Sequence, residues 1–323
     1  MQRRHLIAGA AGATLLALPG LAPAQDFPRA GMSVKYVVPF PPGGLTDVMA
    51  RNVAQKLSEV LKVPVLVENK AGGNAQIGAD QVAKAAPDGS SLLAITLTHA
   101  ANVSLFPDAP YSLTRDLRPV ALLVGSPMLV VVPAASPITD FRDLMRVART
   151  RTLNAGSSGN GTPPHLTMAL FNDTNQSAMT HVPYRGGAPS MTDLIGGQLD
   201  VIFSNFPESV AHVKAGKLRA LALCSPARHA AVPDVPTTIE AGMPALQVEN
   251  WTAVMAPAKT PDAIVERYSR EILRIMAAPD MAERATQQGF RINARGADEF
   301  AQFLKGEIEL WGRIIKAAKI TAG

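Results

Sequence analysis

The fold is decided by the stretch Val34-Lys35-Tyr36-Val37-Val38-Pro39-Phe40-Pro41-Pro42-Gly43-Gly44-Leu45-Thr46-Asp47. Its first part, Val34–Val38, is a run of β-branched and aromatic residues that is typical of a buried strand. A turn rich in proline and glycine follows, and apolar residues at helical spacing over 50–61 indicate a helix that begins near Thr46 or Asp47. Such a turn points free backbone N–H groups and a positive helix end at one place, which attracts anions. One loop of this kind alone is more simply an ordinary connection between a strand and a helix.

Length and composition narrow the class of protein. With 323 residues, of which 47% are apolar, two domains are the natural expectation. The 31 basic and 26 acidic residues give a net charge of +5, without basic clusters or interleaved aromatic residues, so we expect no nucleic-acid partner. The single cysteine, Cys224, ends the apolar run 218–224 and is expected to be a buried thiol outside any disulfide or metal site.

The first 24 residues have the features of an export signal. Arg3 and Arg4 form a basic start, 6–18 is an apolar stretch, and Ala22-Pro23-Ala24 is a small-residue cleavage site. A membrane anchor is the alternative, but the apolar run is too short to span a bilayer. We therefore expect a periplasmic protein, exported by the Sec or the twin-arginine route.

Expected strands and helices alternate along the chain, which argues for mostly parallel sheets with helices on both faces. Val120–Val124 and Met128–Val132 are expected as two strands that Gly125-Ser126-Pro127 separates, at a first crossing into a second domain. The apolar run 92–97 is expected as a strand that ends in a loop at Thr98, and Trp251–Met255 as the return strand. Trp251 is expected to pack in the core, with a place in the wall of the cleft as the alternative, and from Pro261 the chain is expected to be helical. The expected domains are residues 25–125 with 254–323, and residues 126–253.

Four loops share one character, because each follows an expected strand and precedes an expected helix. They are Phe40–Asp47, Gly72–Asn74, Ser157–Thr162 and Tyr184–Gly187. In an open α/β sheet such loops gather at the carboxyl edge of the strands, where ligands bind. Two fall in each domain and they contain almost no Lys or Arg, so a cleft between the domains could hold a small anion, rather a carboxylate than a phosphate, through N–H groups, hydroxyls and water.

Enzyme motifs were sought and are incomplete. Gly156-Ser157-Ser158-Gly159-Asn160 differs from a Gly-x-Ser-x-Gly nucleophile turn at its last position, and the neighbouring glycines break the dinucleotide fingerprint. An exported serine hydrolase that uses Ser157 or Ser158 with His165 stays open as an alternative, although the turn that would form an oxyanion hole is absent. No acidic residue stands at ligand spacing from His99 or His181, so no metal is expected, and no cofactor motif is present.

The loop Pro39–Asp47 in an exported two-domain α/β chain resembles the Bug family, the substrate-binding receptors of tripartite tricarboxylate transporters. The resemblance extends over essentially the whole mature chain, in the segments Val67–Lys70, Ile77–Asp80, Ala85–Gly89, Ser157–His165, His181–Gly186 and Asp193–Asp200. It implies a type II periplasmic binding protein fold with an interdomain cleft, a carboxylate ligand, no enzymatic activity and no cofactor. It also implies delivery to membrane permease subunits, by a protein that we expect to be a monomer. A receptor that reports to a sensor protein is the alternative.

Loops, strand ends and resemblance together select the candidate ligand-binding residues: Phe40, Pro41, Gly43, Gly44, Asp47, Gly72, Gly73, Asn74, Thr98, Ser157, Gly161, Thr162, His165, Tyr184, Gly186, Ser204 and Asn205. Two positions depart from the family pattern. Gly73-Asn74-Ala75 stands in for the last three residues of the usual Gly-Ala-Gly-Gly, and Asn and Ala restrict the backbone more than Gly does. Ser204 stands where many relatives carry an aspartate suited to a ligand ammonium group. Ser204 therefore predicts a preference for carboxylates without an amine.

Overall fold

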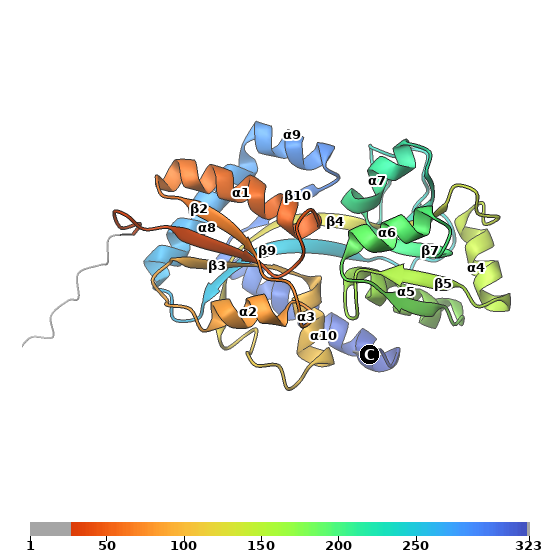
Figure 1. Ribbon diagram of the computed structural model, residues 1–323, viewed down its shortest axis with the longest axis horizontal. Helices are drawn as coiled ribbons and strands as arrows, with labels where there is room; N and C mark the ends of the chain where they lie inside the picture. Colours follow the sequence, from red (N-terminus) through yellow and green to blue (C-terminus); the bar gives the residue numbers. More distant parts are fainter. Residues whose placement is uncertain (1–26, 322–323) are drawn as a thin grey trace, which may run out of the picture.

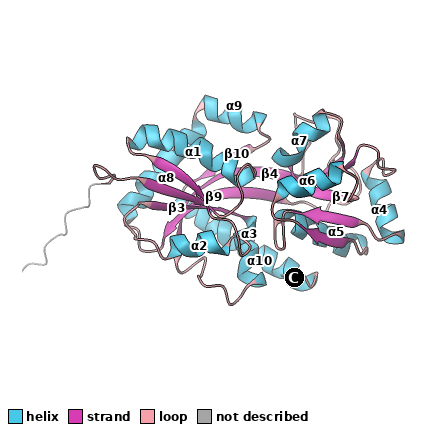
Figure 2. Ribbon diagram, viewed as in Figure 1, coloured by secondary structure: helices cyan, strands magenta, loops and turns pink. Residues whose placement is uncertain are grey.

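The computed structural model describes residues 27–321, which form two α/β lobes side by side (Figure 1). Each lobe has a sheet with helices on both faces (Figure 2). One long strand runs through both lobes, so the strands form a continuous sheet in the order β2-β1-β3-β9-β4-β7-β5-β6, with β8 and β10 also paired to β4. The two-domain architecture expected from the sequence is confirmed. The expected export signal, residues 1–24, lies outside the described residues.

The first lobe contains the N-terminal and C-terminal parts of the chain. Its elements are β1 (Val34–Val38), α1 (Leu45–Leu61), β2 (Val65–Asn69), α2 (Gln76–Ala83), β3 (Ser91–Thr96), α3 (Leu97–Leu105), the first part of β4 (Leu117–Pro133), β9 (Glu249–Pro257), α8 (Asp262–Ala277), α9 (Pro279–Gln287), β10 (Arg291–Arg295) and α10 (Ala297–Ala317). Helices α1, α8 and α9 cover one face of the sheet, and α2, α3 and α10 cover the other (Figure 1).

The second lobe contains the middle of the chain. Its elements are the last part of β4, α4 (Phe141–Thr150), β5 (Asn154–Ser157), α5 (Pro163–Asn175), β6 (Thr180–Pro183), α6 (Gly187–Ile195), β7 (Val201–Asn205), α7 (Phe206–Lys214) and β8 (Leu218–Leu223). Helices α6 and α7 pack on one face, where Leu129, Leu194 and Phe206 are buried. Helices α4 and α5 cover the other face around Phe171 and Phe203.

The decisive stretch folds as the sequence predicts. Strand β1 spans Val34–Val38, and α1 begins at Leu45, one residue before the expected start. Met49, Val53 and Leu57 recur at helical spacing and are fully buried against the sheet, so this face anchors the helix. Burying each of these side chains contributes about 1.5–3 kcal/mol.

The sheets are mixed, because only their outer strands are parallel. Strand β1 pairs in parallel with β2 and β3, and β5 pairs in parallel with β6 and β7. The strands nearest the middle of the molecule are antiparallel: β9 to β3 and β4, and β4 to β7 and β8. The long return connection from β8 to β9 brings the chain back to the first lobe beside β4.

The expected break at Gly125–Pro127 is wrong, since β4 is one strand of 17 residues. Its residues up to Pro127 pair with β9, and those from Met128 pair with β7 and β8, so the strand changes lobe without interruption. Because Gly125 has no side chain, the Glu249 side chain can occupy the space beside it. An ion pair with Arg291, 2.7 Å long, holds Glu249 there. Glycine within this strand therefore marks a close approach of a side chain and not a turn.

Two further elements differ from the expectation. The loop expected after 92–97 is the helix α3, which Thr96 caps by accepting a hydrogen bond from Thr98 N–H at 3.2 Å. The segment after Pro261 was expected to be helical throughout, but β10 interrupts it and pairs antiparallel with β4. Among the described residues, no helix is long and apolar enough to cross a membrane.

Helix α10 anchors the return strand. Trp251 of β9 is buried, contacts the rings of Phe300 and Phe303, and donates a 2.8 Å hydrogen bond from Nε1 to Glu307 Oε2. Trp311 donates to the same oxygen at 3.2 Å. Trp251 therefore belongs to the core, as the sequence led us to expect.

Candidate functional site

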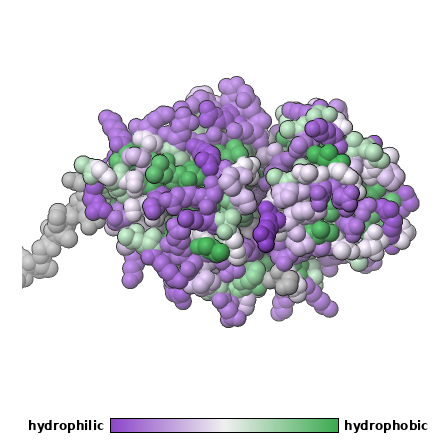
Figure 3. Space-filling model, viewed as in Figure 1, coloured by the Kyte–Doolittle hydropathy of each residue, from purple (hydrophilic) through white to green (hydrophobic). Residues whose placement is uncertain are grey.

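A pocket of about 500 Å³ lies between the two lobes and is called the interlobe pocket below. The molecular surface is indented where the lobes meet (Figure 3). The N-termini of five helices reach it, two from the first lobe and three from the second. Their N-cap residues all line the pocket: Gly44 of α1, Thr96 of α3, Thr162 of α5, Gly186 of α6 and Asn205 of α7.

Four of these helix starts have no side-chain cap, the exception being α3. The first N–H groups of a helix have no partner within the helix, and the helix dipole adds a partial positive charge there. Prolines in the first turn of α5 and α7 leave fewer N–H groups at these two starts. Thr98 adds a hydroxyl that lines the pocket, is fully buried, and has no hydrogen-bond partner among the described residues. The pocket therefore offers donors from both lobes to a small anion.

The first loop is held in shape by Asp47, which lies behind it. One carboxylate oxygen accepts hydrogen bonds from Gly43 N–H at 2.9 Å and Arg51 Nε at 3.0 Å, and the other accepts from Asn69 Nδ2 at 2.8 Å. Burial by itself would raise the pKa of Asp47, but these hydrogen bonds outweigh it and the pKa lies below its usual value. Asp47 is 3% exposed and does not line the pocket, so its position suits it to orient the loop.

Gly43 and Gly44 have different tasks in this loop. Gly43 has φ +84°, a left-handed conformation that favours glycine, whereas Gly44 has φ −77° and ψ 171°. A side chain at Gly44 is therefore compatible with the backbone. What it would obstruct is the approach of a ligand to the start of α1.

The positive partial charge of the pocket comes chiefly from backbone N–H groups. Within the described chain no Lys or Arg side chain lines it, and Glu208 is its one acidic residue. Burial raises the pKa of Glu208, and hydrogen bonds from the Asn205 side chain and the Leu45 N–H oppose this rise. Asn205 is itself fixed by Asn250, whose Nδ2 donates to its Oδ1 at 2.8 Å.

The two lobes contact each other on several sides of the pocket. The Glu208 carboxylate of the second lobe lies next to Gly44 of the first lobe. Pro41 lies so close to Gly186 that a Cβ added at Gly186 would be in tight contact with the proline ring. Gly161 lies against Asn74 and Leu105. The structure thus has the lobes closed on each other.

Eight of the sequence-predicted residues line the interlobe pocket: Phe40, Pro41, Gly43, Gly44, Thr98, Thr162, Gly186 and Asn205. The other nine do not: Asp47, Gly72, Gly73, Asn74, Ser157, Gly161, His165, Tyr184 and Ser204. Tyr184 donates its hydroxyl to Asp193 at 2.6 Å. Ser204 is buried and donates to the backbone oxygen of Asn205 at 3.0 Å.

The second loop is a contact between the lobes instead of a wall of the pocket. Asn74 and Asn102 exchange hydrogen bonds, each donating from Nδ2 at 2.8 Å, and Asn74 lies next to Gly161 of the other lobe. Asn74 and Ala75 have φ values of 52° and 69°, so the loop keeps a left-handed backbone without glycine at either position. The departure from the family pattern therefore leaves this backbone conformation accessible.

Ser157 and His165 do not pair as a hydrolase would require. Ser157 Oγ lies 2.6 Å from Nε2 of His181, and His165 Nδ1 accepts a hydrogen bond from Gly161 N–H at 3.0 Å. The two imidazoles stack with ring centroids 3.8 Å apart. Burial lowers the pKa of both to about 4, and for His165 the neighbouring His181 contributes as well. The histidines form a neutral structural pair beside the third loop.

Sequence reasoning missed several residues of the pocket, above all Glu208, Asn250 and Thr96. A local signal existed for Glu208, because Pro207 in the first turn of a helix marks a helix start, and an acidic residue there is favourable. No local signal identified Asn250, which reaches the pocket because β9 runs beside β4 at the crossing.

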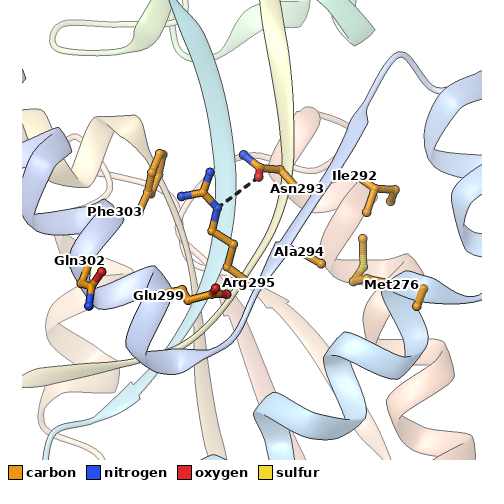
Figure 4. Close-up of a pocket in the computed structure, with 9 residues that line it drawn as sticks. Met276, Ile292, Asn293, Ala294, Arg295, Glu299, Gln302 and Phe303 are labelled. Carbon is orange, nitrogen blue, oxygen red and sulfur yellow. Dashed lines mark hydrogen bonds between the residues drawn. The ribbon is translucent and has the colours of Figure 1, made fainter.

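A second hollow, of about 640 Å³, lies on the first lobe between β10 and α10 (Figure 4). Arg295 lies over the ring of Phe303 at 5.1 Å and donates to Asn293 at 3.3 Å. Asp298 and Glu299 occupy the first turn of α10, so this helix start already has its negative partners. This hollow is the weaker candidate, because it combines no donors from two lobes. In the described residues no group of three or more His, Cys, Asp or Glu residues is placed to hold a metal ion.

Comparison with known proteins agrees with this geometry. Residues 49–320 match the model of the tripartite tricarboxylate transporter family receptor. Protein BugT of Bordetella pertussis is 34% identical over 287 residues, 88% of each chain. The Rhodopseudomonas palustris protein Rpa4515, solved with adipate, is 31% identical with a TM-score of 0.87, covering 92% of this chain and 99% of its own. MatC from the same organism, solved with bound malate, is 32% identical with a TM-score of 0.82, covering 89% and 100%.

The matched family consists of transporter receptors, and two of the relatives were solved with small carboxylates. The chain is therefore a binding protein and not an enzyme, and the hydrolase alternative is set aside. The family predicted from the loop Pro39–Asp47 is confirmed. The match covers most of the chain, from within α1 to the end of α10, and the loop Pro39–Asp47 directly precedes it. The chain belongs to the tripartite tricarboxylate transporter family of receptors.

Proposed function

We propose that this protein captures a small carboxylate in the interlobe pocket and delivers it to the membrane permease subunits of a tripartite transporter. The observation that carries the proposal is the meeting of five helix N-termini, four without a side-chain cap, in a pocket without Lys or Arg. A carboxylate fits such a site because it accepts several N–H hydrogen bonds at once. The family and the relatives solved with malate and adipate support the same class of ligand.

A panel of carboxylates and their amides tests the binding step. At about a hundred times its dissociation constant, a ligand of the folded state adds roughly 2.7 kcal/mol to the free energy of unfolding. We expect carboxylates to raise the melting temperature and fully amidated analogues of the same length to leave it unchanged. Equal shifts from an acid and its full amide would refute anion recognition by the helix starts.

Delivery and export need separate experiments. Cells that carry the permease subunits should take up a labelled carboxylate only when this receptor is present, whereas a receptor for a sensor protein would leave uptake unchanged. A periplasmic fraction should contain a monomer that begins at Gln25, because cleavage after Ala24 removes the export signal. Mass spectrometry of the N-terminus and light scattering measure both properties.

A further inference from the structure

Glu208 occupies a place in the interlobe pocket that an anionic ligand would be expected to fill. It lies in the first turn of α7, and its carboxylate reaches between the starts of α1 and α6. A methyl group at Gly44 would lie 3.7 Å from its Oε1, and at Gly187 a methyl group would overlap the carboxylate. The side chain thus comes from one lobe and ends against the other.

Hydrogen bonds keep the carboxylate in this position. The Leu45 N–H at the start of α1 and the Asn205 side chain both interact with it. Asn205 is fixed in turn by Asn250 of β9, whose own Oδ1 accepts from Trp251 N–H at 2.9 Å. Glu208 is therefore part of a network that joins the crossing strand to α7 and α1.

The remaining donors are at the other helix starts. Thr98 near the start of α3 is fully buried and its Oγ1 has no partner among the described residues. Thr162, the N-cap of α5 in the second lobe, already donates its hydroxyl to Gly159 O at 2.6 Å, so its side chain is not a free donor. One ligand carboxylate can use the Thr98 hydroxyl and N–H groups at these helix starts, but a second one would lie near Glu208 without a Lys or Arg side chain in the pocket to offset the repulsion.

We propose that Glu208 restricts the interlobe pocket to carboxylates whose other end carries a hydrogen-bond donor, such as an amide, hydroxyl or ammonium group, and disfavours ligands that are anionic at both ends. This inference rests on the proposed function and specifies its ligand class. In this proposal Glu208, within the pocket, determines which ligands bind. Ser204 does not, because its hydroxyl bonds to the backbone outside the pocket.

Pairs of diacids and their monoamides test the inference, because the members of each pair have nearly the same shape. Succinate with succinamate, and adipate with adipamate, separate the effect of charge from that of ligand length. Calorimetry with the wild-type protein should give at least tenfold tighter binding of the better-fitting monoamide than of its diacid. In Glu208→Gln we expect the diacid to gain at least tenfold while the monoamide changes less than threefold, since the amide keeps the shape and removes the charge.

Glu240→Gln provides the matched control, because it removes a carboxylate of the same lobe that bonds to Arg228 outside the pocket. Its ratio of diacid to monoamide affinity should equal that of the wild type. Circular dichroism verifies folding, and Glu208→Ser repeats the test if the glutamine variant is unfolded. Diacid preference in the wild type with an unchanged ratio in both Glu208 variants would overturn this inference and leave the proposed function intact. Failure of every carboxylate to bind would overturn the proposed function as well.

Discussion

The side-chain amide of Asn250 donates a 2.8 Å hydrogen bond to Oδ1 of Asn205, which joins the start of β9 to the N-cap of α7. Both residues line the interlobe pocket and are almost fully buried. Asn250 also accepts a hydrogen bond from Trp251 N–H at 2.9 Å. The pair therefore links the return of the chain at the lobe crossing to the helix that carries Glu208.

The first prediction concerns this pair. Asn250→Ala leaves the buried Oδ1 of Asn205 without its donor, which should lower the free energy of unfolding by about 1–3 kcal/mol. Ligand affinity should fall too, because Asn205 no longer fixes Glu208. Urea unfolding with and without ligand measures both effects. As a control, Asn293→Ala removes a side-chain amide that accepts a hydrogen bond from Arg295 on the first lobe, outside the interlobe pocket, and should leave affinity unchanged. An Asn250→Ala protein as stable as the wild type would mean that the hydrogen bond contributes nothing.

The second prediction concerns the start of α1. Gly44→Val should abolish carboxylate binding, because its branched side chain would fill the pocket beside Glu208 at the start of α1. Folding should be retained, since φ −77° and ψ 171° are open to β-branched residues and the nearest atom to a new Cβ is 3.7 Å away. Gly296→Val is the matched control: Gly296 caps α10 with φ −69° and ψ 178° and lies outside the pocket. Wild-type affinity in a folded Gly44→Val protein would remove this helix start from the site.

The sequence could predict what is encoded locally. The strand Val34–Val38, the turn Phe40–Gly44 and the following helix lie next to one another, and each has its own composition signal. Residues at the expected carboxyl edge, such as Thr98 and Asn205, were found for the same reason. This local information was enough to place the pocket at the meeting of loops from two lobes.

The parts that could not be predicted depend on contacts between distant segments. Gly125–Pro127 has the composition of a turn, but pairing with β9 and the space required by Glu249 keep it in a strand. Helix α3 continues an apolar run without a break, so no change in composition marks its start at Leu97. The position of Glu208 between α1 and α6 follows from the closing of the lobes, which a linear pattern does not contain.

The third prediction concerns the stacked pair His165 and His181, whose pKa values burial lowers to about 4. Between about pH 4 and 6.5 the unfolded chain binds protons that the folded pair does not, so the free energy of unfolding should rise with pH across this window and fall on acidification. Each histidine contributes a slope of at most about 1.4 kcal/mol per pH unit.

The variant His165→Phe isolates this effect, because it keeps an aromatic ring against His181 and removes one titrating group. Urea unfolding between pH 4.5 and 7.5 should give a flatter dependence for the variant than for the wild type, with the largest difference near pH 5. Titrating groups away from the stacked pair behave alike in the two proteins and cancel in the comparison. Parallel curves would show that the pair does not remain neutral in the folded state.

The last prediction concerns closure of the lobes at Gly161. A methyl group there would lie 2.7 Å from Leu105 Cδ1 and 2.8 Å from Asn74 Nδ2, both on the other lobe. Asn74 cannot easily give way, because it exchanges two hydrogen bonds with Asn102. Gly161→Ala should therefore hold the lobes apart, weaken ligand binding at least tenfold, and increase the radius of gyration of the ligand-bound protein in X-ray scattering.

Gly216→Ala separates this contact from backbone strain, since Gly216 has nearly the same φ, +69° against +66°, with no atom within 4 Å of a new Cβ. Both variants should lose about 1–2 kcal/mol of stability from the left-handed alanine. Only Gly161→Ala should lose ligand affinity. An equal loss of affinity in both variants would mean that backbone strain, and not the contact between the lobes, weakens binding.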